Sequence, residues 1–118
     1  MVAFTLQYEM SYTNILNINS FICFYSTMLY KINKKDIIVD PLALTISSNP
    51  ESAKVTLEAI RIIRNELGLY TSLGVSNISF GLPERDLVTS TFYVMALNSG
   101  LNCAIMNPYS TEMMKAYR

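Results

Sequence analysis

The segment Asp36-Ile37-Ile38-Val39-Asp40-Pro41 decides the fold class of this chain. Residues 37–39 form a short run of β-branched apolar side chains, which is the pattern of a strand buried on both faces of a parallel sheet. Pro41 ends this strand, because proline has no N–H group to give to the next ladder bond. The sequence therefore predicts a buried strand and, after it, a loop that opens with an aspartate-proline pair.

A long helix is predicted after this loop. Asn49-Pro50-Glu51 has the features of a helix start: a capping side chain, a proline at the first helical position and an acid in the first turn. Up to residue 67, apolar and polar side chains occupy opposite stripes. The apolar stripe holds Ala53, Leu57, Ile60 and Leu67, and the polar stripe holds Glu51, Lys54, Glu58, Arg61 and Asn65. Gly68 stands where a left-handed C-terminal cap belongs.

The order of strand and helix recurs twice more along the chain. A second strand is predicted at 69–75 and a second helix at about 84–99, closed by Gly100. A third apolar run, 103–106, precedes a short helix at 110–117 that begins at a Ser/Thr cap. In the second helix, the side chains spaced for a buried face are Val88, Phe92 and Met95.

The interval between the strands points to two architectures. Taken from Asp36, Tyr70 and Asn102, the strands recur after 34 and 32 residues. A (β/α)8 barrel spends about 31 residues on each strand–helix unit, so three such units fit part of a barrel or half of a doubly wound sheet. Both are α/β folds, and both place ligands at the carboxyl ends of the strands.

Each predicted strand is followed by an Asp or Asn side chain, namely Asp40, Asn77 and Asn107. In a barrel these three side chains would converge on the mouth. Two interpretations stay open, because such side chains also bond the local backbone, and the prolines after Asp40 and Asn107 simply stop a strand. Gly74, inside the second strand, has an ordinary interpretation as well, since a glycine there permits close packing.

Composition excludes several classes of protein. The 118 residues suit one small domain, and with 51% hydrophobic and 15% charged residues the chain is not of the disordered class. Nine basic residues balance nine acidic ones, which argues against a nucleic-acid partner. Histidine is absent, which excludes Ser-His, Cys-His and histidine-metal arrangements, and no metal site is predicted. We interpret Cys23 and Cys103 as free thiols rather than a disulfide or metal site, which predicts a cytoplasmic location.

Residues 1–32 differ from the rest of the chain. Glu9 is the only charge in the first thirty residues, and no sustained period is present. The apolar stretch 21–30 is about half as long as a membrane span and lacks the flanks of a secretory signal, so no membrane association is predicted. A buried strand pair, a helix and a partly ordered appendage all remain open for it. We therefore divide the chain into an irregular segment, 1–32, and a regular part, 33–118.

Two segments of the regular part carry a family resemblance: Val39-Asp40-Pro41-Leu42 and, about 35 residues later, Gly74-Val75-Ser76-Asn77-Ile78-Ser79-Phe80-Gly81-Leu82-Pro83-Glu84-Arg85. They resemble the pterin-binding barrel of corrinoid-dependent methyltransferases, among them the methyltetrahydrofolate domain of cobalamin-dependent methionine synthase. The resemblance covers about residues 34–118. It implies a partial (β/α)8 TIM barrel of the dihydropteroate-synthase-like type, made of the last three strand–helix units. Residues 1–32 do not resemble the fourth and fifth strands of that family.

The resemblance implies roles for the matched side chains in binding methyltetrahydrofolate, the methyl donor. Asn77 is the expected catalytic residue, because its amide can donate a hydrogen bond to N5, which must gain positive character before the methyl group leaves. Asp40 offers two acceptor oxygens to a ring N–H and the exocyclic NH2 of the pterin. The further candidates are Arg85, for the pterin or the folate carboxylates, Ser76, Ser79, and Asn107, at the pterin edge.

The function implied is transfer of the N5 methyl group to the cobalt of a corrinoid. The usual cobalamin signature, Asp-x-His-x-x-Gly, needs a histidine, so another protein or domain is expected to carry the corrinoid (cobalamin). The Ser-Arg and Arg-x-His elements of dihydropteroate synthase have no counterpart here, which argues against pterin condensation. The alternatives are a truncated, non-catalytic pterin-binding fragment and a nonfunctional gene remnant. An open barrel arc also has edges through which copies of the chain can pair as a homo-oligomer.

Overall fold

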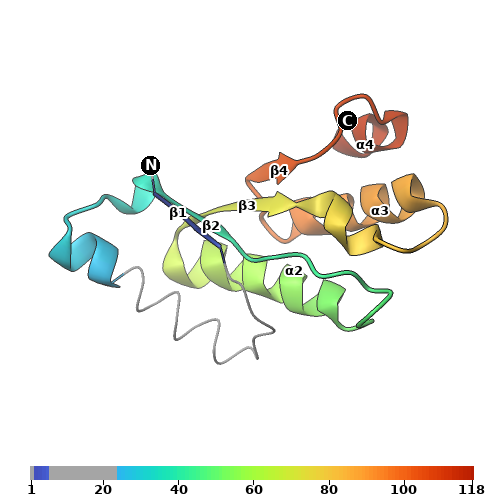
Figure 1. The fold of residues 1–118 in the computed structure, drawn as a ribbon. Helices are drawn as coiled ribbons and strands as arrows, with labels where there is room; N and C mark the ends of the chain where they lie inside the picture. Colours follow the sequence, from blue (N-terminus) through green and yellow to red (C-terminus); the bar gives the residue numbers. More distant parts are fainter. Residues whose placement is uncertain (1, 6–23) are drawn as a thin grey trace.

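The computed structural model describes residues 2–5 and 24–118. Strands alternate with helices along the chain (Figure 1). The strands are β1 (Val2–Thr5), β2 (Ile37–Asp40), β3 (Tyr70–Gly74) and β4 (Cys103–Ile105), and the α-helices are α2 (Ser52–Ile62), α3 (Arg85–Asn98) and α4 (Thr111–Tyr117). Short helical turns complete the described elements: η1 (Tyr25–Leu29), η2 (Lys34–Asp36), η3 (Ile63–Leu67) and η4 (Val75–Ser79).

The four strands form one parallel sheet in the order β1-β2-β3-β4. Val39 of β2 lies opposite Thr71 of β3, and Leu73 of β3 lies opposite Ala104 of β4. The prediction of an α/β fold in which three strands are parallel neighbours in sequence order is therefore confirmed. Among the described strands, β1 and β4 are the edges of the sheet. Association of copies through these edges stays a prediction.

Strand β1 lies in the segment for which the sequence showed no regular pattern. It pairs with β2 in parallel, with Thr5 opposite Asp40. The strands begin at Val2, Ile37, Tyr70 and Cys103, at intervals of 35, 33 and 33 residues. Strand β1 therefore stands one repeat before the three predicted strands, whereas the division of the chain at residue 32 stays a prediction. Of the apolar stretch 21–30, residues 21–23 lie outside the described residues, and η1 occupies most of the remainder.

Helices cover one face of the sheet, and the other face is more open. Ile37 and Val39 are fully buried against Ile63 of η3, whereas Ile38 between them is half-buried. The prediction that the first strand is buried on both faces is therefore wrong. The reason is the alternation of side chains along a strand: every second residue faces the helices, and the described elements leave the opposite face partly in water. Ile105 of β4 is exposed on that face.

The predicted apolar stripe is confirmed at Leu57 and Ile60, whereas Ala53 and Leu67 are only partly buried. Leu57 and Ile60 are buried in a core shared with Leu73 of β3 and Phe92 of α3. The side chain of Asn49 accepts a hydrogen bond from the Glu51 amide at 3.1 Å, but the α-helix begins at Ser52 and its N-cap is Glu51, so Asn49 caps the turn before α2 and not, as predicted, the helix itself. The C-terminal cap is also as predicted, because Gly68 has a φ of 68°.

The buried face of α3 differs from the prediction. Phe92 is buried and Val88 is partly buried against the same core, but Met95 is 49% exposed. Thr89, Tyr93 and Ala96 are buried with Phe92 instead, so the core-facing stripe is rotated by about one residue. A cause is visible at the start of the helix, where the hydroxyls of Thr89 and Ser79 are 2.8 Å apart and fix which face packs inward.

Two glycines that close helical segments make a matched pair for a stability test. Gly68 has a φ of 68° and open space where a Cβ would stand, whereas Gly100 has a φ of 104° and a Cβ there would lie 3.1 Å from Cγ of Arg64. We expect Gly68→Ala to lower the free energy of unfolding by about 1 kcal/mol and Gly100→Ala to lower it by at least about 2 kcal/mol. The second change costs more because it adds a steric clash with Arg64 to the backbone strain. Urea unfolding measures both costs, and an equal cost or the reverse order would contradict this packing.

Candidate functional site

The carboxyl ends of the strands carry the candidate residues. Asp40 is the last residue of β2, Asn77 lies in η4 directly after β3, and Asn107 follows β4. Because these strands are parallel neighbours, the three residues lie at the same end of the sheet, where the strands finish. Asp40, Asn77 and Asn107 thus lie at one end of the sheet, as the sequence predicted.

Asp40 is half-buried and held by its own loop. Its Oδ1 accepts a hydrogen bond from the Leu42 amide at 2.9 Å. Leu42 has a φ of 59°, a left-handed conformation that a leucine rarely adopts, and its carbonyl accepts from the Thr56 hydroxyl of α2 at 3.1 Å. Among the described residues, no donor is bonded to the other oxygen, Oδ2. The loop therefore fixes one carboxylate oxygen, and the second accepts no hydrogen bond from the described residues.

Burial raises the pKa of the Asp40 carboxyl, and the hydrogen bond from Leu42 partly opposes that rise in pKa. Replacing Asp40 by asparagine is therefore expected to stabilise the chain near neutral pH. Ionising Asp40 costs more in the folded chain than in the unfolded chain, so its penalty is full above the folded pKa and vanishes below the ordinary value of 3.8. Asparagine keeps the oxygen that accepts from Leu42.

The measurement is the unfolding midpoint of the parent chain and of Asp40→Asn as a function of pH. The variant should be the more stable near neutral pH, and the two midpoints should converge at about pH 3. A variant that is less stable than the parent near neutral pH would contradict this account of the Asp40 environment.

Asn77 lies against the end of β3. A Cβ added to Gly74 would stand 3.3 Å from Nδ2 of Asn77, so the amide folds back over the glycine. Within the described part of the chain, no hydrogen bond is formed to the Asn77 side chain, and this residue is exposed. Gly74 thus permits close packing, as one interpretation of the sequence predicted. The group that packs against it is the amide of Asn77, the candidate catalytic residue.

Arg85, the first residue of α3, is turned back onto η4. Its Nε donates to the Ser79 hydroxyl at 3.2 Å, and its NH2 group donates to the Ser76 carbonyl at 3.2 Å. The guanidinium carbon lies 4.4 Å from the centroid of the Phe80 ring, within cation–π range. Two of the five N–H donors of Arg85 are used in this way, and the other three make no hydrogen bond to the described residues.

Ser79 has a different place from the other candidates. It is fully buried, and its hydroxyl contacts the Ser76 carbonyl at 3.2 Å, the Thr89 hydroxyl at 2.8 Å and Nε of Arg85. The structure therefore places Ser79 behind Arg85, where it orients the guanidinium.

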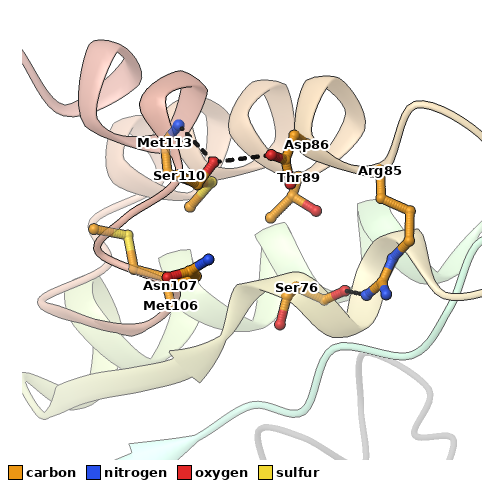
Figure 2. Close-up of a pocket in the computed structure, with 8 residues that line it drawn as sticks. All are labelled: Ser76, Arg85, Asp86, Thr89, Met106, Asn107, Ser110 and Met113. Atoms are coloured by element: carbon orange, nitrogen blue, oxygen red, sulfur yellow. Dashed lines mark hydrogen bonds between the residues drawn. The ribbon is translucent and has the colours of Figure 1, made fainter.

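A pocket of about 290 Å³ lies at this end of the sheet, between η4, the loop after β4 and the first turns of α3 and α4 (Figure 2). It brings together three of the candidates, Ser76, Arg85 and Asn107, but Asp40 and Asn77 do not line it. Asn107 makes its own turn, because its Oδ1 accepts from the Tyr109 amide at 3.0 Å. The other lining residues are Asp86, Thr89, Met106, Ser110 and Met113.

Sequence reasoning missed these five lining residues. Asp86 accepts a hydrogen bond from the Ser110 hydroxyl at 3.2 Å and so joins α3 to α4 across the pocket (Figure 2). The one signal available was helical spacing, because Thr89 follows Arg85 by four residues and shares its face. Nothing in the sequence pairs Asp86 with a serine 24 residues later.

No group of three or more side chains suited to hold a metal ion is present in the described residues. No helix among them has the length and apolarity needed to cross a membrane. Cys103 is an exposed free thiol, and Cys23 lies outside the described residues.

Comparison with known proteins gives the family of the chain. The family of pterin binding enzymes matches residues 24–107. The chain belongs to this family. The resemblance noted for the block from Gly74 to Arg85 is confirmed. The family has a TIM-barrel-like fold, and the parallel sheet described above is consistent with part of such a barrel.

Two relatives agree with this assignment. The methylcorrinoid:tetrahydrofolate methyltransferase of Eubacterium limosum is 33% identical over 90 residues, which are 74% of this chain and 32% of that protein. The methionine synthase of Mycobacterium tuberculosis is 34% identical over 83 residues, which are 64% of this chain and 7% of that protein. The chain thus spans about a third of the length of the first relative and less than a tenth of the second.

Proposed function

We propose that the carboxyl ends of β2 and β3 form part of the methyltetrahydrofolate site of a corrinoid-dependent methyltransferase. We further propose that the described strand–helix units are the last units of its barrel. One observation carries the proposal. In a chain of the pterin-binding family, a half-buried carboxylate, Asp40, and an amide, Asn77, stand at the ends of neighbouring parallel strands, and among the described residues neither Oδ2 of Asp40 nor the amide of Asn77 has a hydrogen-bond partner.

The role proposed for Asp40 is to hold the pterin ring. Its Oδ1 is already fixed by Leu42, so the carboxylate is oriented before a ligand arrives. The second oxygen can accept from a ring N–H or from the exocyclic NH2 group, and an ionised acceptor makes the stronger of the available hydrogen bonds. Because the loop supplies the orientation, little conformational entropy is lost at Asp40 when the ligand binds.

The role proposed for Asn77 is catalytic. Transfer of a methyl group between N5 of the folate and cobalt changes the charge on N5, and an amide can donate to N5 or rearrange when N5 is protonated. Arg85, held by Ser76 and Ser79, has donors left for the pterin or for the folate carboxylates. Asn107 and Ser76 are proposed to contact the ligand from the adjoining pocket.

A partner protein or domain is proposed to carry the corrinoid. The chain has no histidine with which to form the usual cobalamin signature. The name of the Eubacterium limosum relative describes transfer from a methylcorrinoid to tetrahydrofolate, and for this chain we propose the opposite direction, from methyltetrahydrofolate to cobalt. The same two atoms exchange the methyl group in both directions, so the roles of Asp40 and Asn77 are unchanged.

Binding of methyltetrahydrofolate by the 118-residue chain tests the proposal. About four hydrogen bonds worth about 1 kcal/mol each correspond to a Kd of about 1 mM, which ligand-detected NMR can measure. Asp40→Ala should abolish saturable binding. Asp36→Ala is the matched control, because it removes an exposed carboxylate just before the amino end of β2, the end opposite Asp40, and it should leave the Kd within about twofold. Absence of saturable binding by the parent chain, or equal losses in both variants, would overturn the proposal.

A further inference from the structure

We propose that Thr45 and Ser47 are positioning residues of this site, and the inference rests on the proposed function. Their hydroxyls both donate to the carbonyl of Phe80, from Thr45 Oγ1 at 2.6 Å and from Ser47 Oγ at 2.8 Å. The two hydroxyl oxygens are 2.9 Å apart. Two hydroxyl hydrogens and the two lone pairs of one carbonyl oxygen match in number, so this arrangement satisfies both donors. We call these three residues, Thr45, Ser47 and Phe80, the loop clamp.

The loop clamp joins the two loops that carry the proposed ligand contacts. Thr45 and Ser47 lie in the loop that begins after Asp40, and Phe80 lies between Asn77 and Arg85. A backbone bond beside the clamp, from the Ile46 amide to the Ile78 carbonyl at 3.1 Å, adds a third link between the same loops. Gly81, with a φ of 77°, lets them approach, since a Cβ there would stand 3.3 Å from the Ser47 hydroxyl oxygen.

The loop clamp acts where the sheet no longer aligns the two loops. The last paired residues between β2 and β3 are Val39 and Thr71, six residues before Asn77. Beyond that point the relative position of Asp40 and Asn77 depends on contacts between the loops. A ligand that bonds both residues is sensitive to this position, because a displacement of about 1 Å is enough to weaken an aligned contact strongly.

The same clamp also reaches Arg85. The carbonyl of Phe80 receives the two hydroxyls, and the ring of Phe80 lies 4.4 Å from the Arg85 guanidinium. On the other side, the loop of Thr45 is anchored to α2, because the Ser52 hydroxyl donates to the Leu44 carbonyl at 3.0 Å. A continuous set of contacts thus runs from α2 through the clamp to Arg85.

The test compares variants that differ in these hydroxyls, with methyltetrahydrofolate as the probe. Thr45→Val with Ser47→Ala should weaken binding by about fivefold to tenfold, and Ser47→Ala alone by about twofold to threefold. Exchanging the two residues, as Thr45→Ser with Ser47→Thr, keeps both hydroxyls and should restore the affinity. Ser48→Ala is the control, because the Ser48 hydroxyl bonds the Thr45 carbonyl within its own loop.

Affinities are measured at a temperature at which the unfolding curve of each variant shows it fully folded, so that a stability loss does not count as a binding loss. If the parent chain binds and the double variant binds equally well, the positioning role is overturned and the proposed function stands. The positioning role is likewise overturned if the hydroxyl-retaining exchange or Ser48→Ala weakens binding as much as the double variant. If the parent chain shows no saturable binding, the proposed function itself is overturned.

Discussion

Replacing Ile60 by alanine is expected to cost about 3–4 kcal/mol of folding free energy. Ile60 is fully buried, and it lies in the core where Leu73 of β3 and Phe92 of α3 meet α2. Truncation removes three carbons and leaves a cavity that the surrounding helices and strands fill only in part. A domain of this size has a total stability of about 5–15 kcal/mol, so the loss is a large share of it.

Urea unfolding followed by circular dichroism measures this loss. Val55→Ala is the matched control, because Val55 lies on the same helix but is 42% exposed. We expect the control to change stability by less than about 0.5 kcal/mol, since exposed sites tolerate truncation and alanine favours helix. A cost below about 1 kcal/mol for Ile60→Ala would show that α2 does not pack on the sheet as described.

The second large effect concerns turnover. We expect the 118-residue chain alone to leave the rate of methyl transfer from methyltetrahydrofolate to added cob(I)alamin at its uncatalysed value. Asn77 is exposed, and the contacts proposed for Asp40 and Arg85 hold the ligand weakly. Loss of alignment by about 1 Å costs about a hundredfold in rate, so a mobile pterin forfeits the effect of the Asn77 amide.

The measurement is the change in the cob(I)alamin absorption spectrum with and without the chain. Asn77→Ala supplies the comparison. Binding without turnover would favour the alternative of a non-catalytic pterin-binding fragment for this chain by itself. A rate above the uncatalysed value that Asn77→Ala removes would contradict the expectation and show that these residues hold the pterin firmly.

Local sequence signals predicted most of the fold. The β-branched run at Ile37 marks a strand, and Gly68 marks the end of a helix, because each depends on a few neighbouring residues. Strand β1 was missed because four residues without a flanking period give no such signal. The exposure of Met95 was missed for another reason: the face that α3 buries is set by contacts with η4, which lie outside the helix.

The candidate site could be predicted only where the same type of residue, Asp or Asn, follows each predicted strand. Asp40 and Asn77 stood out because each follows a strand. The loop clamp has no such signal, because one of its partners is a backbone carbonyl 33 residues from Ser47 and 35 residues from Thr45. Every residue has a backbone carbonyl, so the sequence does not indicate which carbonyl will accept a given hydrogen bond. The partner is known only once the structure is known.

The measurement that tests the central claim most directly is a map of amide chemical shifts during a titration of the isotope-labelled chain with methyltetrahydrofolate. The claim is that the carboxyl ends of β2 and β3 hold the pterin. It predicts the largest changes at Leu42, Ser76 and Asn77. It predicts little change at Tyr70 and Asn102, which lie at the opposite end of the sheet, where the strands begin. Absence of any change in chemical shift at saturating ligand, or changes of equal size at both ends of the sheet, would contradict this claim.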